Sequence, residues 1–147
     1  MSFATTEATA AELDDVKKLV SDARGLFVRL LEMSLNHSQT KGSCLYAVIL
    51  CSTLINKFTK HKARIRGGNG VSDGGLFIGQ VGHGHYWVEL DMHGTPYIID
   101  ITADQFGLSP IIIADSLSLP ARYEPGNQAT VDSHVEGEMS AMKSELC

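Results

Sequence analysis

The chain has 147 residues, of which 44% are hydrophobic and 20% charged, and this composition predicts one soluble domain with a single core. No run approaches the roughly 18 apolar residues of a membrane span, and the start of the chain lacks the charged and apolar regions of a signal peptide. Three cysteines, Cys44, Cys51 and Cys147, exclude a disulfide scaffold and fit a reducing compartment. We expect a cytoplasmic protein, or one exported without a classical signal, that has no membrane partner.

The net charge of −5 is distributed unevenly. Residues 1–40 carry a charge of −2, residues 41–66 carry +6 with no acid, and residues 67–147 carry −9. A basic block can bind phosphate or RNA. We interpret this one as the cationic end of a helix, where positive charge complements the helix dipole, so we do not expect nucleic acid as a partner.

Helical periodicity dominates the first part of the chain. Apolar residues recur at three- and four-residue steps from Ala11 to about Leu35, and Gly25 is expected to kink or divide this helix. A second helix is predicted from about Ser43 to Lys60, with Ser43 as its N-cap. This helix is apolar on most sides, which is typical of a buried helix.

Strands and turns follow the second helix. Strands are predicted near residues 63–66, 76–78, 85–90, 96–101 and 111–113, and the glycine-rich run 67–75 is interpreted as a mobile loop over a cleft. Helices followed by strands indicate an α+β fold with an antiparallel sheet.

The expected organisation has three parts. Residues 1–9 are predicted to be a disordered N-terminus, residues 10–125 a single domain that includes the N-terminal helix, and residues 126–147 a polar tail or short helix.

The chemistry-bearing residues begin with Cys44, at the start of the predicted buried helix. The helix dipole and the free backbone N–H groups at that position favour a thiolate and can bind a developing oxyanion. Gly42 permits close approach of a substrate. Cys51 lies two turns further along the apolar stripe and is expected to be core.

A predicted hairpin supplies the other two groups. If residues 91–94 form its loop, His85 pairs with Asp100, Trp87 with Ile98, and Val88 with Tyr97. Opposite residues have Cβ atoms about 5 Å apart, which lets a carboxylate reach an imidazole. The carboxylate fixes the histidine tautomer and leaves the other ring nitrogen free to act on a nucleophile.

These motifs resemble the transglutaminase-like branch of the papain-like cysteine hydrolases over residues 42–107. That family has a Gly-x-Cys helix start, matched by residues 42–44, a His-x-Trp-Val-Glu strand, matched by residues 85–89, and an Asp-x-Thr strand end, matched by residues 100–102. The resemblance implies a papain-like fold in which a buried helix carrying Cys44 packs on a sheet carrying His85 and Asp100. It also implies amide-directed acyl transfer on a protein or peptide substrate, without a metal or other cofactor.

The oxyanion-binding side chain is less clearly marked. By analogy with papain-like enzymes, Gln39 is a candidate donor, with Asn36 and His37 as competitors. Trp87 is expected to lie in the core or to form the wall of the cleft beside the histidine, where it is a candidate for substrate contact.

Two other functions compete with the enzyme hypothesis. The fold could serve as an inactive adaptor that presents its cleft to a partner. Alternatively, His83 and His85 share a face and could bind zinc with Asp100 or Cys44, as in a metal hydrolase.

Overall fold

The computed structural model describes residues 10–35, 44–115, 119 and 121–146. In chain order the elements are α1 (Ala10–Leu35), α2 (Cys44–Phe58), β1 (Lys62–Gly68), β2 (Gly75–Ile78), β3 (Val81–His83), β4 (His85–Met92), β5 (Thr95–Asp100), the 3₁₀ helix η1 (Ala103–Phe106), β6 (Ile112–Asp115), β7 (Arg122–Glu124) and α3 (Gln128–Leu146). The fold is therefore α+β, as the sequence predicts.

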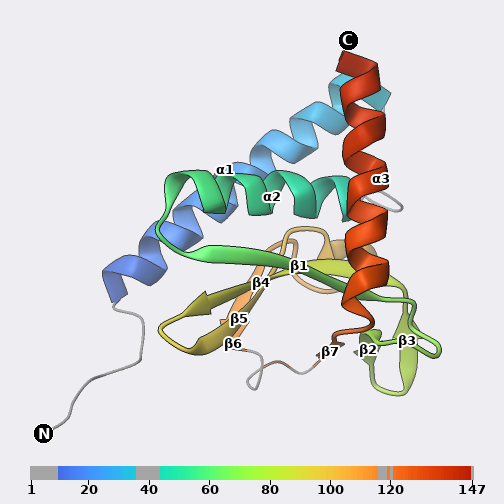
Figure 1. Cartoon of the computed structure of the whole chain (residues 1–147). Helices are drawn as coiled ribbons and strands as arrows, with labels where there is room; N and C mark the ends of the chain where they lie inside the picture. The colour runs from blue at the N-terminus through green and yellow to red at the C-terminus, as the bar shows by residue number, and fades with distance from the viewer. Residues whose placement is uncertain (1–9, 36–43, 116–118, 120, 147) are drawn as a thin grey trace, which may run out of the picture.

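The described strands form two antiparallel sheets. The larger has the order β1-β4-β5-β6 and the smaller the order β3-β2-β7. Helices α1 and α2 lie over the same face of the larger sheet, while the smaller sheet lies beside one end of it (Figure 1). Helix α3 rises past the end of β1 and the start of α2 (Figure 1).

The main core lies between the two N-terminal helices and the larger sheet. Alternate residues of β4, Val88, Leu90 and Met92, point into this core, where they join buried residues of both helices. This alternation follows from the two-residue period of a strand. The alternate set of β4 residues, Trp87, Glu89 and Asp91, points to the opposite face.

Both predicted N-terminal helices are present, with boundaries close to those expected. Helix α1 is unbroken through Gly25, so the expected division is wrong. Burial of Val16, Val20, Ala23 and Phe27 on one face holds the helix together across the glycine. The expected N-cap, Ser43, lies outside the described residues, as do residues 1–9.

The β4–β5 hairpin has a shorter loop than the sequence predicted. Its turn consists of His93 and Gly94, which both have positive φ (56° and 88°), and Met92 pairs with Thr95. Two left-handed residues match the strand twist, and this favours the two-residue turn over a four-residue loop. Val88 consequently pairs with Ile99 instead of Tyr97, a register two residues from the predicted one.

The glycine-rich run forms a compact turn rather than an open loop. The Asn69 side-chain oxygen accepts hydrogen bonds from the backbone N–H groups of Val71, Ser72 and Asp73. Gly70 donates to the Gly74 carbonyl at 2.7 Å, and the turn packs against the backbone of β3 and of Gly126. Glycine is required here because backbone segments approach closely.

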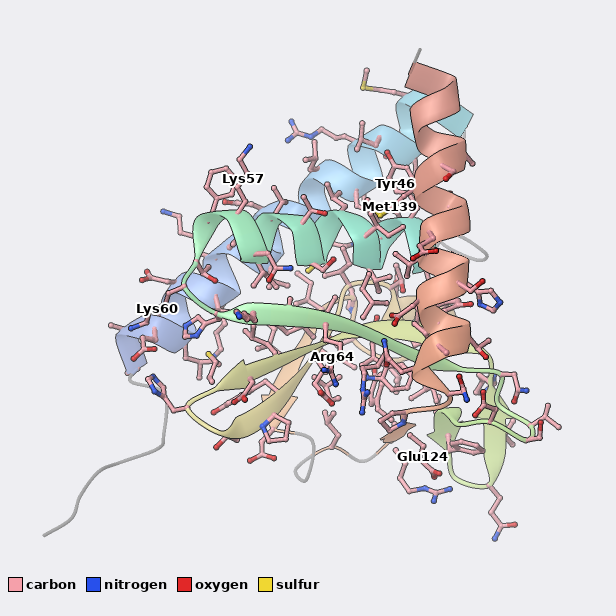
Figure 2. All side chains as sticks on the ribbon, in the orientation of Figure 1. Tyr46, Lys57, Lys60, Arg64, Glu124 and Met139 are labelled. Carbon is pink, nitrogen blue, oxygen red and sulfur yellow. The ribbon has the colours of Figure 1, made fainter. Side chains whose placement is uncertain are left out.

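The basic block does not form one continuous surface. Lys57 and Arg64 lie on opposite sides of the α2–β1 layer, and Lys60 lies at the turn between these elements (Figure 2). On the outer face of the sheet, Arg64 lies opposite Glu89 in the β1–β4 register, and Arg66 Nε is 3.6 Å from a Glu89 carboxylate oxygen. The bases of β1 therefore face acids of β4, and only Lys57 lies in the last turn of α2.

The C-terminal segment is a helix of 19 residues and not a tail. Asn127 caps it by accepting a hydrogen bond from the Thr130 N–H at 3.0 Å. Val131 is buried, and the Gln128 side chain donates to the Ile65 carbonyl on β1. Among the described segments, no helix combines the length and apolar character that a membrane crossing requires.

Two glycine substitutions distinguish the packed turn from the helix. Gly74→Ala should lower the free energy of unfolding by about 1 kcal/mol or more, because Gly74 has a φ of 68° and a Cβ there would overlap the Glu124 carbonyl oxygen. Gly25→Ala should raise it by about 0.5–1 kcal/mol, because nothing lies within 4 Å of a Cβ in that helix. Urea unfolding of both variants tests this, and equal effects would contradict the packing described.

Candidate active site

Three elements bring together the residues singled out in the sequence. Cys44 is the first residue of α2, His85 the first residue of β4, and Asp100 the last residue of β5. Each group therefore lies at an element end, where backbone N–H or C=O groups are not all used by secondary structure. His85 and Asp100 are both 1% exposed, whereas Cys44 is half-buried.

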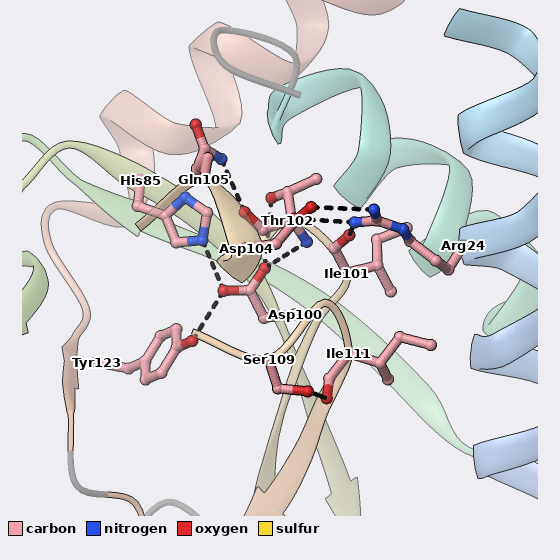
Figure 3. Close-up of polar contacts among 10 residues, drawn as sticks. All are labelled: Arg24, His85, Asp100, Ile101, Thr102, Asp104, Gln105, Ser109, Ile111 and Tyr123. Atoms are coloured by element: carbon pink, nitrogen blue, oxygen red, sulfur yellow. Dashed lines mark hydrogen bonds and ion pairs between the residues drawn. The ribbon is translucent and has the colours of Figure 1, made fainter. Parts of the chain in front are cut away.

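His85 and Asp100 form a buried ion-pair contact. His85 Nε2 lies 2.7 Å from Asp100 Oδ2 (Figure 3). A carboxylate only accepts hydrogen bonds, so Nε2 carries a proton in this contact. The predicted pairing of these side chains is confirmed.

The contact is formed in a different register from the expected one. The two-residue shift makes His85 and Asp100 diagonal neighbours instead of directly opposite residues. A register shift of two residues keeps each side chain on its face of the sheet. Long side chains at diagonal positions on adjacent strands can still touch. The histidine–carboxylate contact therefore survives an error in the predicted turn.

Asp100 accepts four hydrogen bonds. Besides His85, the Tyr123 hydroxyl donates to Oδ2 at 2.8 Å, and Thr102 donates to Oδ1 from its N–H at 3.0 Å and from its hydroxyl at 3.4 Å (Figure 3). A buried carboxylate is costly unless donors replace its lost hydration. These donors fix the orientation of Asp100 and hence that of the imidazole.

The loop after β5 is braced from α1. Arg24 makes a two-pronged contact with Asp104, with N–O distances of 2.9 and 3.0 Å, and also donates to the Ile101 carbonyl at 2.6 Å (Figure 3). This partly buried fork holds η1 in place. The Phe106 ring of η1 packs edge-on against the His85 ring at a centroid distance of 4.9 Å.

The second ring nitrogen of His85 is the one available to a nucleophile. Nδ1 is buried and has no hydrogen-bond partner among the residues that the structure describes. The Cys44 thiol lies close enough to the imidazole to affect its titration, although it does not complete a hydrogen bond to Nδ1. Such bonds are often long in resting sites and tighten with substrate.

The surroundings of His85 favour its charged form. Burial by itself would lower the pKa of His85, but the hydrogen bond to Asp100 and the interactions with Cys44 raise that pKa to about 9. The structure therefore favours an imidazolium at neutral pH. The positive charge of this imidazolium balances the negative charge of a thiolate placed beside it.

Of the remaining candidate site residues, those that the structure describes make no hydrogen bond to the His85–Asp100 pair. Trp87 is fully buried and packs edge-on against Tyr123 at 5.1 Å, which agrees with a core role and not with substrate contact. Gln39, Asn36 and His37 lie outside the described residues. Cys51 is buried as expected, and burial raises its pKa to about 12, so this thiol is held in its neutral form.

The metal hypothesis gains no support from the arrangement of side chains. Within residues 10–35, 44–115 and 121–146, no group of three or more His, Cys, Asp and Glu is placed to hold an ion. The His83 ring instead packs against Phe106 at a centroid distance of 4.8 Å.

Sequence reasoning missed two contributors to the site. Tyr123 comes from a strand that the sequence did not predict, and Phe106 from a short 3₁₀ helix. Both lie outside the three matched motifs, and no local pattern marks them. Thr102 belongs to the Asp-x-Thr motif, but the sequence does not show that it donates hydrogen bonds to Asp100.

Comparisons with known proteins assign no family to the chain, because no protein-family model, no curated protein and no solved structure matches it.

The raised pKa of His85 predicts a pH-dependent contribution to stability. Because the folded-state pKa (about 9) exceeds the ordinary value of 6.5, this contribution is complete below pH 6.5 and is lost as the pH rises through 9. Between these values the free energy of unfolding should fall by up to about 1.4 kcal/mol per pH unit more steeply in the wild type than in His85→Gln. Urea unfolding across this range measures both slopes, and parallel curves would contradict a charged His85.

Proposed function

We propose that the chain is a thiol-dependent acyl-transfer enzyme with Cys44 as nucleophile, His85 as proton carrier and Asp100 as the group that orients His85. The observation that carries this proposal is the buried His85–Asp100 contact, which leaves Nδ1 without a hydrogen-bond partner among the described residues, close to a half-buried thiol at a helix N-terminus. The α+β architecture, with α2 packed on an antiparallel sheet, is compatible with the papain-like, transglutaminase-like fold that the three motifs resemble.

The proposed first step forms a thioester. The resting site is a thiolate–imidazolium pair, in which His85 Nδ1 holds the Cys44 proton, and the thiolate sulfur bonds to the carbonyl carbon of an amide. The backbone N–H of Cys44 has no intrahelical acceptor, because α2 begins there, and it holds the oxyanion. The imidazolium returns its proton to the leaving nitrogen as the C–N bond breaks, which releases an amine or ammonia.

The second step regenerates the thiolate–imidazolium pair. Water or an acceptor amine loses a proton to His85 Nδ1 while its oxygen or nitrogen bonds to the thioester carbon. The C–S bond then breaks, and the thiolate leaves beside the protonated His85. Water gives a peptidase, amidase or glutamine deamidase, and an amine gives a transglutaminase, so the substrate class is a protein or peptide amide.

Differential alkylation tests the nucleophile. At pH 7, iodoacetamide should modify Cys44 at least about tenfold faster than Cys51, because Cys51 is 1% exposed and its raised pKa keeps it protonated. Peptide mass spectrometry after timed quenching reports each cysteine separately. Equal rates at Cys44 and Cys51 would overturn the enzyme proposal and favour an inactive adaptor.

Matched variants test whether His85, rather than the solvent exposure of Cys44 alone, sets the rate of Cys44 alkylation. His85→Gln should slow Cys44 alkylation by about tenfold or more, because the thiolate loses its counter-charge. His93→Asn is the control, because it removes an imidazole at the other end of β4, in a turn whose left-handed φ asparagine tolerates. A Cys44 rate that is the same in both variants would contradict the assigned role of His85.

A covalent intermediate is the direct test of the chemistry. Acid quenching during incubation with glutamine-containing peptides should trap an acyl adduct on Cys44, with release of ammonia or of an amine fragment. Cys44→Ala should form no adduct while retaining the wild-type unfolding midpoint within a few degrees. Turnover by Cys44→Ala at the wild-type rate would exclude thiol catalysis.

A further inference from the structure

We propose that Tyr123 is a positioning residue that sets how strongly Asp100 holds the protonated His85, and that the smaller sheet serves to deliver its hydroxyl to the site. This inference rests on the proposed function, because it concerns the same site. Tyr123 lies on β7, which pairs with β2 and lies outside the larger sheet that carries His85 and Asp100.

The tyrosine and histidine share one acceptor atom. The Tyr123 hydroxyl is 2.8 Å from Asp100 Oδ2, and His85 Nε2 is 2.7 Å from the same oxygen (Figure 3). The two Thr102 contacts go to the other oxygen, Oδ1. Tyr123 is therefore the described side chain that competes directly with His85 for the negative charge on Oδ2.

Packing holds the tyrosine ring in this orientation. Its ring lies edge-on to the fully buried Trp87 at 5.1 Å, and its backbone pairs with Leu76, which is also fully buried. The contact with Trp87 and the pairing of β7 with β2 therefore favour the orientation in which the hydroxyl faces Asp100.

The tyrosine acts as a constant donor. Burial, followed by the charge of Asp100, raises the pKa of Tyr123 well above its usual range, so the hydroxyl keeps its proton throughout the working pH range. A permanent second donor on Oδ2 disperses part of the carboxylate charge. The imidazolium is then held less tightly, which eases the transfer of its proton to the leaving nitrogen.

The decisive measurement is the titration of His85 itself. In Tyr123→Phe the charge on Oδ2 is no longer shared, so the pKa of His85 should rise by about half a unit or more. Imidazole ¹⁵N chemical shifts report this value without any substrate. Tyr97→Phe, on β5 of the larger sheet, is the matched control and should leave the titration unchanged.

A fluorinated tyrosine gives a second test with the opposite sign. Site-specific 3,5-difluorotyrosine at position 123 donates a stronger hydrogen bond and adds only two small atoms, so the pKa of His85 should fall. This measurement keeps the proposal open to refutation if Tyr123→Phe does not fold. The pH profile of Cys44 alkylation should move with the titration of His85 in both variants.

A purely structural tyrosine predicts a different result. Lower stability in Tyr123→Phe, with an unchanged His85 titration and an unchanged alkylation profile, would overturn the positioning role and leave the proposed function standing. Conversely, an unreactive Cys44 would overturn the proposed function, while a shifted His85 titration would still support the tyrosine's control of the His85–Asp100 pair.

Discussion

The structure depends on one buried carboxylate. Asp100 is 1% exposed, and its burial is tolerated because His85, Thr102 and Tyr123 satisfy it with four hydrogen bonds. These donors come from three separate places: the start of β4, the residues just after β5, and β7 of the smaller sheet. The energetic requirement of a single side chain therefore joins both sheets at the same point and fixes the imidazole beside Cys44.

The two N-terminal helices and the glycine turn hold the elements that carry His85, Asp100 and Cys44. Helix α2 places its N-terminus at the site because its apolar face is buried against the larger sheet, and α1 reaches the same region through the Arg24–Asp104 fork. The compact glycine turn connects β1 to β2 and packs against Gly126 ahead of α3.

Local patterns predicted the α+β class, both N-terminal helices and the face shared by His85 and Asp100. They failed where the answer depended on partners distant in sequence. The hairpin register depended on whether His93 and Gly94 could both take positive φ, and polar α3 is held by Val131 and by Gln128 against β1. Asn127 caps α3 in the structure, but the polar composition of residues 126–147 left a tail and a short helix equally open in the sequence.

The sequence alone determined the identities and order of Cys44, His85 and Asp100, because helix starts and strand alternation are local properties of the chain. Tertiary structure decided how these groups are paired and held. It buried the His85–Asp100 contact, left Nδ1 without a hydrogen-bond partner in the part of the chain that the structure describes, and brought the Tyr123 hydroxyl to Oδ2 from a separate sheet. The physical reason is that burial and hydrogen bonding between distant segments set the charge of a histidine, and no local pattern encodes them.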